Sequence, residues 1–217
     1  KPFVNLELVA RIEMLAAKTK RHASHAISAI SGASVAISGA STSAGNRIPH
    51  IGDFLGPYMI LDSLGWGKNS VIYKAVKKGA SDIVAIKLLT KYSMEFKDVV
   101  RRFEVERKVM ERLSHPNLVK FFEAGVWDGC PFIVMECVRG INLEERLVTD
   151  GIPDGPLALS GAKQIAEALA YMHENDALHR DIKLKNIMFN PDTFAFKLSD
   201  FGITKLMDDE SGITTDG

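Results

Sequence analysis

The segment HRDIKLKN, residues 179–186, places one histidine, one aspartate, one asparagine and three cations within eight positions. It follows ALAYMHENDAL, whose apolar spacing is typical of the end of a buried helix. Runs of charge usually form solvated surface loops, and that interpretation competes here with a chemical one. The choice depends on which other charged side chains the chain would bring to the same place.

The segment LSDFG, residues 198–202, ends a predicted strand and places Asp200 where that strand stops. A carboxylate in this position suits Mg²⁺, which prefers a few oxygen ligands together with phosphate oxygens. The side-chain amide of Asn186 could supply a second oxygen. The competing interpretation of Asn186 is a capping or turn residue, which is a common use of asparagine.

Two further charged residues fall where apolar residues are expected. Glu106 lies on the apolar stripe of the predicted helix over 95–114, and Lys87 shares a face with Ala85 in the predicted strand over 82–90. Taken separately, each could be a partly exposed glutamate or a lysine that extends its amine to solvent. Together they predict a buried ion pair, because a lone buried charge is costly.

The segment LGWGKNSVIYKA, residues 64–75, carries Gly65 and Gly67 between two predicted strands. Glycines let backbone N–H groups approach a phosphate, which a Cβ would obstruct. A pair of glycines is weak evidence alone, since a plain hairpin turn is the competing interpretation. Ser70 stands where the third glycine of a G-x-G-x-x-G pattern would be.

The elements that would position these residues are strands first and helices later. Short β-rich runs bounded by turn residues predict strands, and two longer segments have helical apolar spacing. The strands are expected over 58–65, 70–78, 82–90, 118–127, 131–138, 186–190 and 194–200, and the helices over 95–114 and 156–175. One face of the second helix would carry Ala158, Ala162, Ile165, Leu169 and Met172. This order predicts an α+β fold in two lobes.

Composition excludes several classes of protein. The net charge is zero, so nothing indicates a nucleic-acid or membrane surface. No segment approaches the ~18 uninterrupted apolar residues of a transmembrane helix, and no signal peptide is recognisable. Two cysteines are too few for a disulfide framework and favour a reducing, cytoplasmic compartment.

The first fifty residues differ from the rest. Residues 4–22 have helical apolar spacing, so we expect an amphipathic helix over 1–22. A Ser/Gly/Ala-rich linker over 23–50, which contains ISGAS twice, would follow, and the folded domain would occupy 51–217. Because the chain begins with Lys1 and ends in DDESGITTDG, we expect a fragment at both ends.

These segments together resemble the signature set of the protein kinase family. In chain order they are Gly65-x-Gly67, Val84-Ala85-Ile86-Lys87, Glu106 in a helix, His179-Arg180-Asp181-x-Lys183-x-x-Asn186 and Asp200-Phe201-Gly202. The lysine two residues after Asp181 is typical of the serine/threonine branch. The resemblance implies a bilobal fold, with a five-stranded antiparallel N-lobe sheet and one helix over about 57–138, and an incomplete helical C-lobe over about 139–217.

The resemblance also implies a role for each charge around ATP and Mg²⁺. Lys87 would contact the α- and β-phosphates and pair with Glu106. Asp181 would accept the proton of the attacking hydroxyl, and Lys183 would steady the γ-phosphate. The metal ligands would be Asp200 and Asn186. The other nucleotide contacts would come from the glycine loop, the adenine pocket and the hinge: Leu64, Gly65, Gly67, Ser70, Ile72, Ala85, Met188, Met135, Glu136 and Cys137.

Two further implications concern the surroundings of Asp181. His179 would pack in an internal column with Met110, Phe121 and Phe201. Arg180 implies that a phosphate on the following loop neutralises it. The candidate phosphate acceptors are Thr204, Ser211, Thr214 and Thr215.

The implied activity is transfer of the ATP γ-phosphate to a serine or threonine hydroxyl of a protein. A pseudokinase that serves as a scaffold is an alternative, and a small-molecule kinase is a more distant one, since such enzymes typically lack the lysine at position 183. The A-P-E segment and the large helices of the second lobe do not occur before Gly217. We therefore expect the 217-residue chain alone to transfer phosphate poorly.

Overall fold

The computed structural model of the protein describes residues 48–201 and 205–206. The predicted helix over 1–22 and nearly all of the predicted linker over 23–50 lie outside the described residues. The four candidate phosphate acceptors of the last loop also lie outside them.

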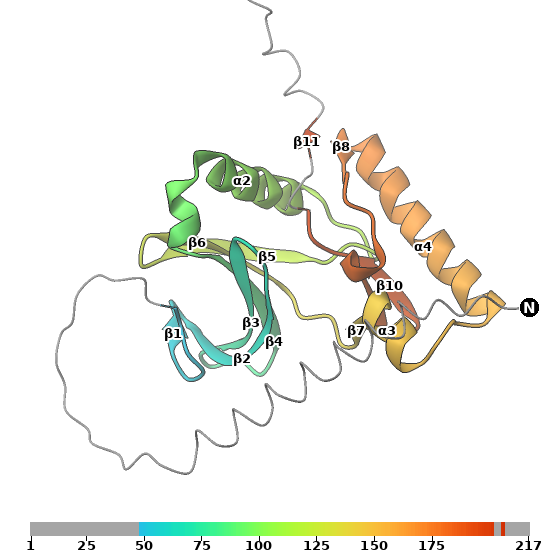
Figure 1. Ribbon diagram of the computed structural model, residues 1–217, viewed down its shortest axis with the longest axis horizontal. Helices are drawn as coiled ribbons and strands as arrows, with labels where there is room; N and C mark the ends of the chain where they lie inside the picture. Colours follow the sequence, from blue (N-terminus) through green and yellow to red (C-terminus); the bar gives the residue numbers. More distant parts are fainter. Residues whose placement is uncertain (1–47, 202–204, 207–217) are drawn as a thin grey trace, which may run out of the picture. The chain divides into compact units, whose positions relative to one another are not determined.

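The first part of the described chain is an antiparallel sheet of six strands in the order β1-β2-β3-β4-β6-β5 (Figure 1). The strands are β1 (Phe54–Leu55), β2 (Tyr58–Trp66), β3 (Ser70–Lys77), β4 (Ile83–Leu89), β5 (Phe121–Trp127) and β6 (Cys130–Glu136). The prediction of five strands was wrong by one, because the two residues of β1 are too few to show alternation. β5 begins later than predicted because Leu118 bridges to Leu198 instead.

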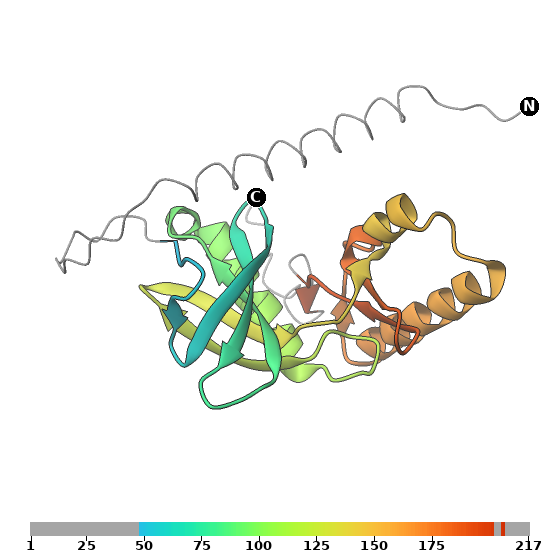
Figure 2. The same cartoon turned by 90° about the horizontal axis from the view of Figure 1, so that it is seen from below.

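The two faces of this sheet are both covered. Along β4, Val84, Ile86 and Leu88 belong to one apolar cluster, together with residues of β1, β2, β3 and β6. Leu89, on the opposite face, belongs to a second cluster. The Tyr58 hydroxyl donates to Glu123 Oε1 at 2.7 Å, which joins β2 to β5 although the two strands are not neighbours. The sheet is therefore strongly curled, as Figure 2 shows.

Between β4 and β5 lie a 3₁₀ turn, η1 (Tyr92–Glu95), and the helix α2 (Lys97–Arg112). The predicted helix is confirmed, with slightly shorter bounds. It ends because Leu113 adopts an extended backbone (φ −99°, ψ 135°). Its buried residues are Phe103, Glu106, Val109 and Met110. An acidic side chain therefore does lie on the apolar stripe.

After β6 the chain forms mostly helices and short strands. These are β7 (Ile141–Asn142), α3 (Leu143–Thr149), α4 (Gly155–Glu174), β8 (Ala177–Leu178), η2 (Leu184–Asn186), β9 (Ile187–Asn190), β10 (Ala195–Leu198) and β11 (Lys205–Leu206). α4 and the β9–β10 hairpin confirm the prediction. β9 lies between β10 and β7, and β11 pairs with β8. None of the described helices is long and apolar enough to cross a membrane.

The buried face of α4 agrees with the predicted one in part, since Ile165 and Met172 are buried as predicted. Ala158 and Ala162 are exposed, and the buried residues are Gly161, Ile165, Ala168 and Met172. At Gly161 an added Cβ would lie 2.9 Å from the ring of Phe196, so the close approach of β10 requires glycine. The helical spacing of α4 was predicted correctly. Alanine occurs on both buried and exposed faces of helices, so the alanines could not show which face of α4 is buried.

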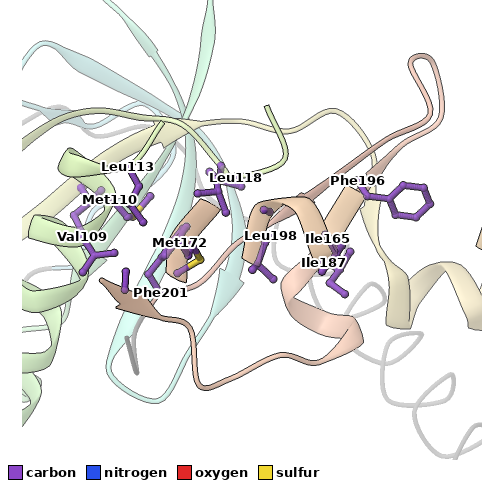
Figure 3. Packing of buried hydrophobic residues seen from close by; sticks show 14 of the residues in the cluster. Val109, Met110, Leu113, Leu118, Ile165, Met172, Ile187, Phe196, Leu198 and Phe201 are labelled. Carbon is purple, nitrogen blue, oxygen red and sulfur yellow. The ribbon is translucent and has the colours of Figure 1, made fainter. Parts of the chain in front are cut away.

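One apolar cluster connects the two parts of the described chain. It contains residues of α2, α4 and β6 and of the short strands that follow α4. Figure 3 shows Val109, Met110 and Leu113 at one end of this cluster, Leu118 and Leu198 between, and Ile165, Ile187 and Phe196 at the other end. Leu198 and Phe201, which belong to the LSDFG segment and lie on either side of Asp200, are fully buried within this cluster. Packing thus fixes the chain on both sides of Asp200.

Candidate active site

Lys87 lies between two carboxylates at the centre of the candidate site. Its Nζ donates to Glu106 Oε1 at 2.6 Å and to Asp200 Oδ1 at 2.9 Å. The Lys87 and Glu106 side chains are 11% and 4% exposed, whereas that of Asp200 is 46% exposed. The predicted buried ion pair is confirmed, and Asp200 presents a second carboxylate to the same amine from the other part of the domain.

The charges of this cluster support one another. Burial acts to lower the pKa of Lys87, but Glu106 and Asp200 outweigh it and the pKa is raised. Burial acts to raise the pKa of Asp200, but Lys87 outweighs it and the pKa is lowered. At neutral pH the site therefore holds an ammonium beside an ionised, half-exposed carboxylate, the arrangement needed to meet a phosphate on one side and a cation on the other.

The segment after α4 orients a second carboxylate. Asp181 Oδ2 accepts from Lys183 Nζ at 2.6 Å and from Asn186 Nδ2 at 3.0 Å. Asn186 Nδ2 also donates to the Asp181 carbonyl at 2.9 Å, and Asn186 is buried. Because Oδ2 is committed to these donors, Oδ1 of Asp181 is the oxygen left to accept a proton from a third group.

Asn186 and Asp200 fit the chemistry of a magnesium site. Among the described residues, no hydrogen bond uses Oδ1 of Asn186 or Oδ2 of Asp200. The two residues are joined through Ser199, whose N–H donates to the Asn186 carbonyl at 2.8 Å and whose hydroxyl donates to the same oxygen at 3.1 Å. Two oxygens held in this way would leave the remaining positions of Mg²⁺ to phosphate and water.

His179 is a structural residue beneath the site. It is 2% exposed, and its Nδ1 accepts from the Asp181 N–H at 3.3 Å. Nε2 therefore carries the proton and donates to the Ser199 carbonyl at 3.1 Å. Burial lowers the pKa of His179, which keeps the ring neutral. Its ring lies 5.6 Å from that of Phe201, in agreement with the contact between these two residues that the predicted internal column implies.

Strained backbone occurs on both sides of the site. Arg180 has φ +60° and Asp200 has φ +63°, values in the left-handed region that non-glycine residues rarely adopt. Such conformations persist only where the surroundings determine them. Here the hydrogen bonds of His179 and Ser199 and the burial of Phe201 do so.

The glycine loop is a tight turn between β2 and β3. The Gly67 N–H donates to the Ser70 carbonyl at 2.8 Å, and a Cβ on Gly67 would lie 3.3 Å from that oxygen. Leu64 lies at an irregularity in the β2–β3 register and is 50% exposed. The pairs along the sheet bring the predicted nucleotide contacts to one face as neighbours: Gly65 with Ile72, Ile72 with Lys87, and Ala85 with Met135.

The predicted hinge has one constraint that the sequence did not indicate. The Glu136 N–H donates to the Lys120 carbonyl at 2.8 Å, and Glu136 Oε2 accepts from Lys197 Nζ at 2.9 Å. The N–H of Glu136 is thus not free for an adenine. Cys137 follows, and burial raises the pKa of its thiol. Met188 lies on β9, paired with Lys197, in a different sheet from Ile72 and Ala85.

Sequence reasoning missed Ser199 and Asn142. Nothing in a serine before Asp200 indicates that it links Asn186 to His179. Asn142 had a signal, since its side chain caps α3 by accepting from the Glu145 N–H at 2.9 Å, a polar cap followed three residues later by glutamate.

Comparison with known proteins agrees with this geometry. Residues 58–216 match the model of the protein kinase domain. The chain is 35% identical over 159 residues to a probable serine/threonine-protein kinase of Clostridium perfringens, covering 73% of this chain and 23% of that protein. It is 37% identical over 166 residues to calcium/calmodulin-dependent protein kinase type IV of Mus musculus, covering 75% and 33%. It is 36% identical over 148 residues to serine/threonine-protein kinase PrkC of Bacillus subtilis, covering 68% and 23%.

These alignments span about a quarter to a third of the length of the relatives. Within that span the order of the motifs, the ion pair of Lys87 and the orientation of Asp181 agree with the resemblance drawn from the sequence. The chain belongs to the protein kinase family, on its serine/threonine branch.

Proposed function

We propose that the protein transfers the γ-phosphate of ATP to a serine or threonine hydroxyl of a protein substrate, with Mg²⁺ as cofactor. The observation that carries this proposal is the position of Lys87 between Glu106 and Asp200. This contact unites a strand, a helix and the segment after β10 around one amine. A scaffold without catalysis would not need the second carboxylate there.

The ammonium of Lys87 would bind the α- and β-phosphates while Glu106 holds it in place. Oδ1 of Asp181 would accept the proton of the substrate hydroxyl as the hydroxyl oxygen forms its bond to the γ-phosphorus. The bond from that phosphorus to the β–γ bridging oxygen breaks, and ADP leaves with the electron pair. Lys183, half-exposed beside Asp181, would offset the charge of the transferring group.

Asn186 and Asp200 would hold Mg²⁺, which when bound neutralises phosphate charge. The turn at Gly65 and Gly67 would cover the phosphates with backbone N–H groups. Catalysis would then consist mainly of positioning and charge stabilisation. The pre-formed hydrogen bonds of Asp181 and Lys87 support this assignment of roles.

We also propose that the protein works in a reducing, cytoplasmic compartment. Cys130 and Cys137 are both free thiols, and the first is buried. Neither forms a disulfide that would indicate an oxidising environment.

The test compares three variants of the full-length protein that contains this chain. In the unmodified protein, Mg-ATP at a concentration of about a hundred times its Kd should stabilise the fold by about 2.7 kcal/mol and so raise the melting temperature. Lys87→Met should abolish this rise in melting temperature. Asp181→Asn should keep that rise and lose transfer of radioactive phosphate to protein. Lys163→Met, on the exposed face of α4, should change neither. A protein that binds Mg-ATP but transfers no phosphate would favour the scaffold alternative.

A further inference from the structure

Among the described residues, β10, the strand that leads to Asp200, is paired with a strand on one edge only. β9 occupies that edge, with Phe196 opposite Phe189 and Leu198 opposite Ile187. The other edge faces the segment between α2 and β5. There the Leu198 N–H donates to the Asn117 carbonyl at 2.8 Å, and the Val119 N–H donates to the Leu198 carbonyl at 3.0 Å.

Two side-chain amides continue this edge, where no strand lies within the part of the chain that the structure describes. Asn117 Nδ2 donates to the Phe196 carbonyl at 2.8 Å, and Gln164 Oε1 accepts from the Phe196 N–H at 2.9 Å. The amides are joined, because Asn117 Nδ2 also donates to Gln164 Oε1 at 2.8 Å. Gln164 Nε2 donates to the Phe194 carbonyl at 3.2 Å. Together they take the place of a missing strand.

The positions of these two amides indicate that they do more than fill space in the core. Asn117 is 7% exposed and lies in the segment that follows α2, whereas Gln164 lies on α4. They therefore fix β10 against two elements at once. Asp200 follows the end of β10 by two residues, and Phe201 after it is buried in the apolar cluster that also contains residues of α2.

We propose that Asn117 and Gln164 are positioning residues that set the place of Asp200 for the metal, by holding the free edge of β10. Neither side chain touches the reacting atoms. Their effect would reach Asp200 through Phe196 and Leu198, the residues whose backbone groups they and their segments bind. This inference rests on the proposed function, in which Asp200 is a ligand of Mg²⁺.

Figure 3 shows the apolar side of the same arrangement. Leu118 and Leu198 lie in the middle of the cluster, between Leu113 of the segment after α2 and Ile165 of α4, and Phe196 lies further along, beyond Ile165. The apolar side chains fill the space between the elements. The directional hydrogen bonds of Asn117 and Gln164 add a constraint on the register of β10 along α4.

The test uses three variants of the protein, two at Gln164 and one at its neighbour Lys163. Gln164→Met keeps the length of the side chain and removes both the acceptor and the donor. Gln164→Glu keeps the acceptor for Phe196 and Asn117 and loses the Nε2 donor to the Phe194 carbonyl and to Ser160 Oγ. Lys163→Met alters the exposed neighbour and serves as the matched control.

Two quantities separate positioning from general weakening. With a fluorescent ATP analogue at saturation, the Mg²⁺ concentration that gives half of the metal-dependent signal should rise about fivefold in Gln164→Met. This is the effect expected if, of the hydrogen bonds that the variant loses, the one from the Phe196 N–H positions Asp200. The Kd of the analogue in EDTA should stay within about twofold of the unmodified protein, because Asp200 does not bind nucleotide without metal. The Mg²⁺ concentration at half of the signal should be intermediate for Gln164→Glu, and for Lys163→Met it should equal that of the unmodified protein.

An unchanged magnesium requirement in Gln164→Met would overturn the proposal. So would an equal weakening of binding in EDTA, which would assign Gln164 a purely structural role. If Gln164→Met does not fold, Gln164→Glu decides the question by the same two quantities.

Hydrogen exchange provides a readout without any nucleotide. The Phe196 and Phe201 amides should exchange faster in Gln164→Met while the amides of α4 keep their protection. Unchanged exchange at both would contradict the proposal. If the unmodified protein binds no nucleotide at all, the proposed function fails, and exchange at Phe201 still decides whether Gln164 holds the segment of Asp200.

Discussion

Replacement of Lys87 by methionine tests the physical basis of the site. Methionine keeps most of the length of the side chain but leaves Glu106, whose side chain is 4% exposed, without a counter-charge. Removal of one partner of a buried ion pair costs about 3–5 kcal/mol. For a domain of this size each kcal/mol lowers Tm by roughly 2–4 °C, so a fall of roughly 6–20 °C is expected.

The cost should also depend on pH. Burial raises the pKa of Glu106, and in the unmodified protein Lys87 counteracts this effect. Without Lys87 this counteracting effect is lost and the rise is larger, so folded Glu106 would bind a proton more tightly than unfolded Glu106, whose pKa is about 4.3. A folded pKa above the unfolded one gives stability that is fully present below about pH 4.3 and is lost as pH rises through the folded value. Lys87→Met should therefore be less stable at pH 8 than at pH 5.

The assay is urea unfolding of Lys87→Met, Glu106→Gln and the double variant at pH 5 and pH 8. The double variant should cost less than the sum of the single variants and should lose the added pH dependence, because no buried carboxylate remains. Additive costs would refute the reasoning. So would a Lys87→Met cost below about 1 kcal/mol at both values, which is the range of an exposed pair.

Three further predictions concern residues away from the ion pair. Burial lowers the pKa of His179, so stability should be lost as pH falls below its unfolded value of about 6.5, and acid unfolding of His179→Asn should lack this step. Burial and the hydrogen bond to Glu123 raise the pKa of Tyr58, so stability should fall as pH rises above about 10, and Tyr58→Phe should reduce this alkaline loss, as measured by urea unfolding at pH 7 and 10.5. Gly140→Ala should cost more than about 3 kcal/mol or prevent folding, because φ is +126° and a Cβ would run into the Phe189 carbonyl oxygen; a melting temperature within a few degrees of the unmodified protein would contradict this.

Sequence patterns predicted the elements that bury a clear apolar face. α2 was recognisable because its buried stripe is apolar except for one glutamate, and this exception predicted the ion pair with Lys87. α3 was not recognised, because none of its residues is buried and only its cap at Asn142 marks it. The start of β5 was placed too early, because Leu118 and Val119 are as apolar as a strand but bind β10 instead.

The amide pair of Asn117 and Gln164 could not be predicted from the sequence. The two residues lie 47 positions apart, and their main partners are backbone groups of β10, which any sequence supplies. Asparagine after a helix is most simply interpreted as a turn residue. Contacts of this kind appear only once the strand has been placed, so residues that position a site are harder to find than residues that form it.

Features that are unusual for a stable fold, such as positive φ and buried charge, are concentrated around the proposed metal and nucleotide sites. Positive φ alone does not mark the site, since Asp128 and Phe194 also have it in turns. At Asp200 it coincides with a carboxylate bonded to a buried ammonium, a strand edge held by side-chain amides and a fully buried phenylalanine next in the chain. Each of these features is costly or improbable alone. Selection for folding stability would not bring all of them to one residue, so their coincidence at Asp200 indicates a functional site. The proposed metal site must present ionised carboxylate oxygens on its exposed side and exclude water on its buried side. The ion pair, the held strand edge and the buried phenylalanine together meet these two requirements.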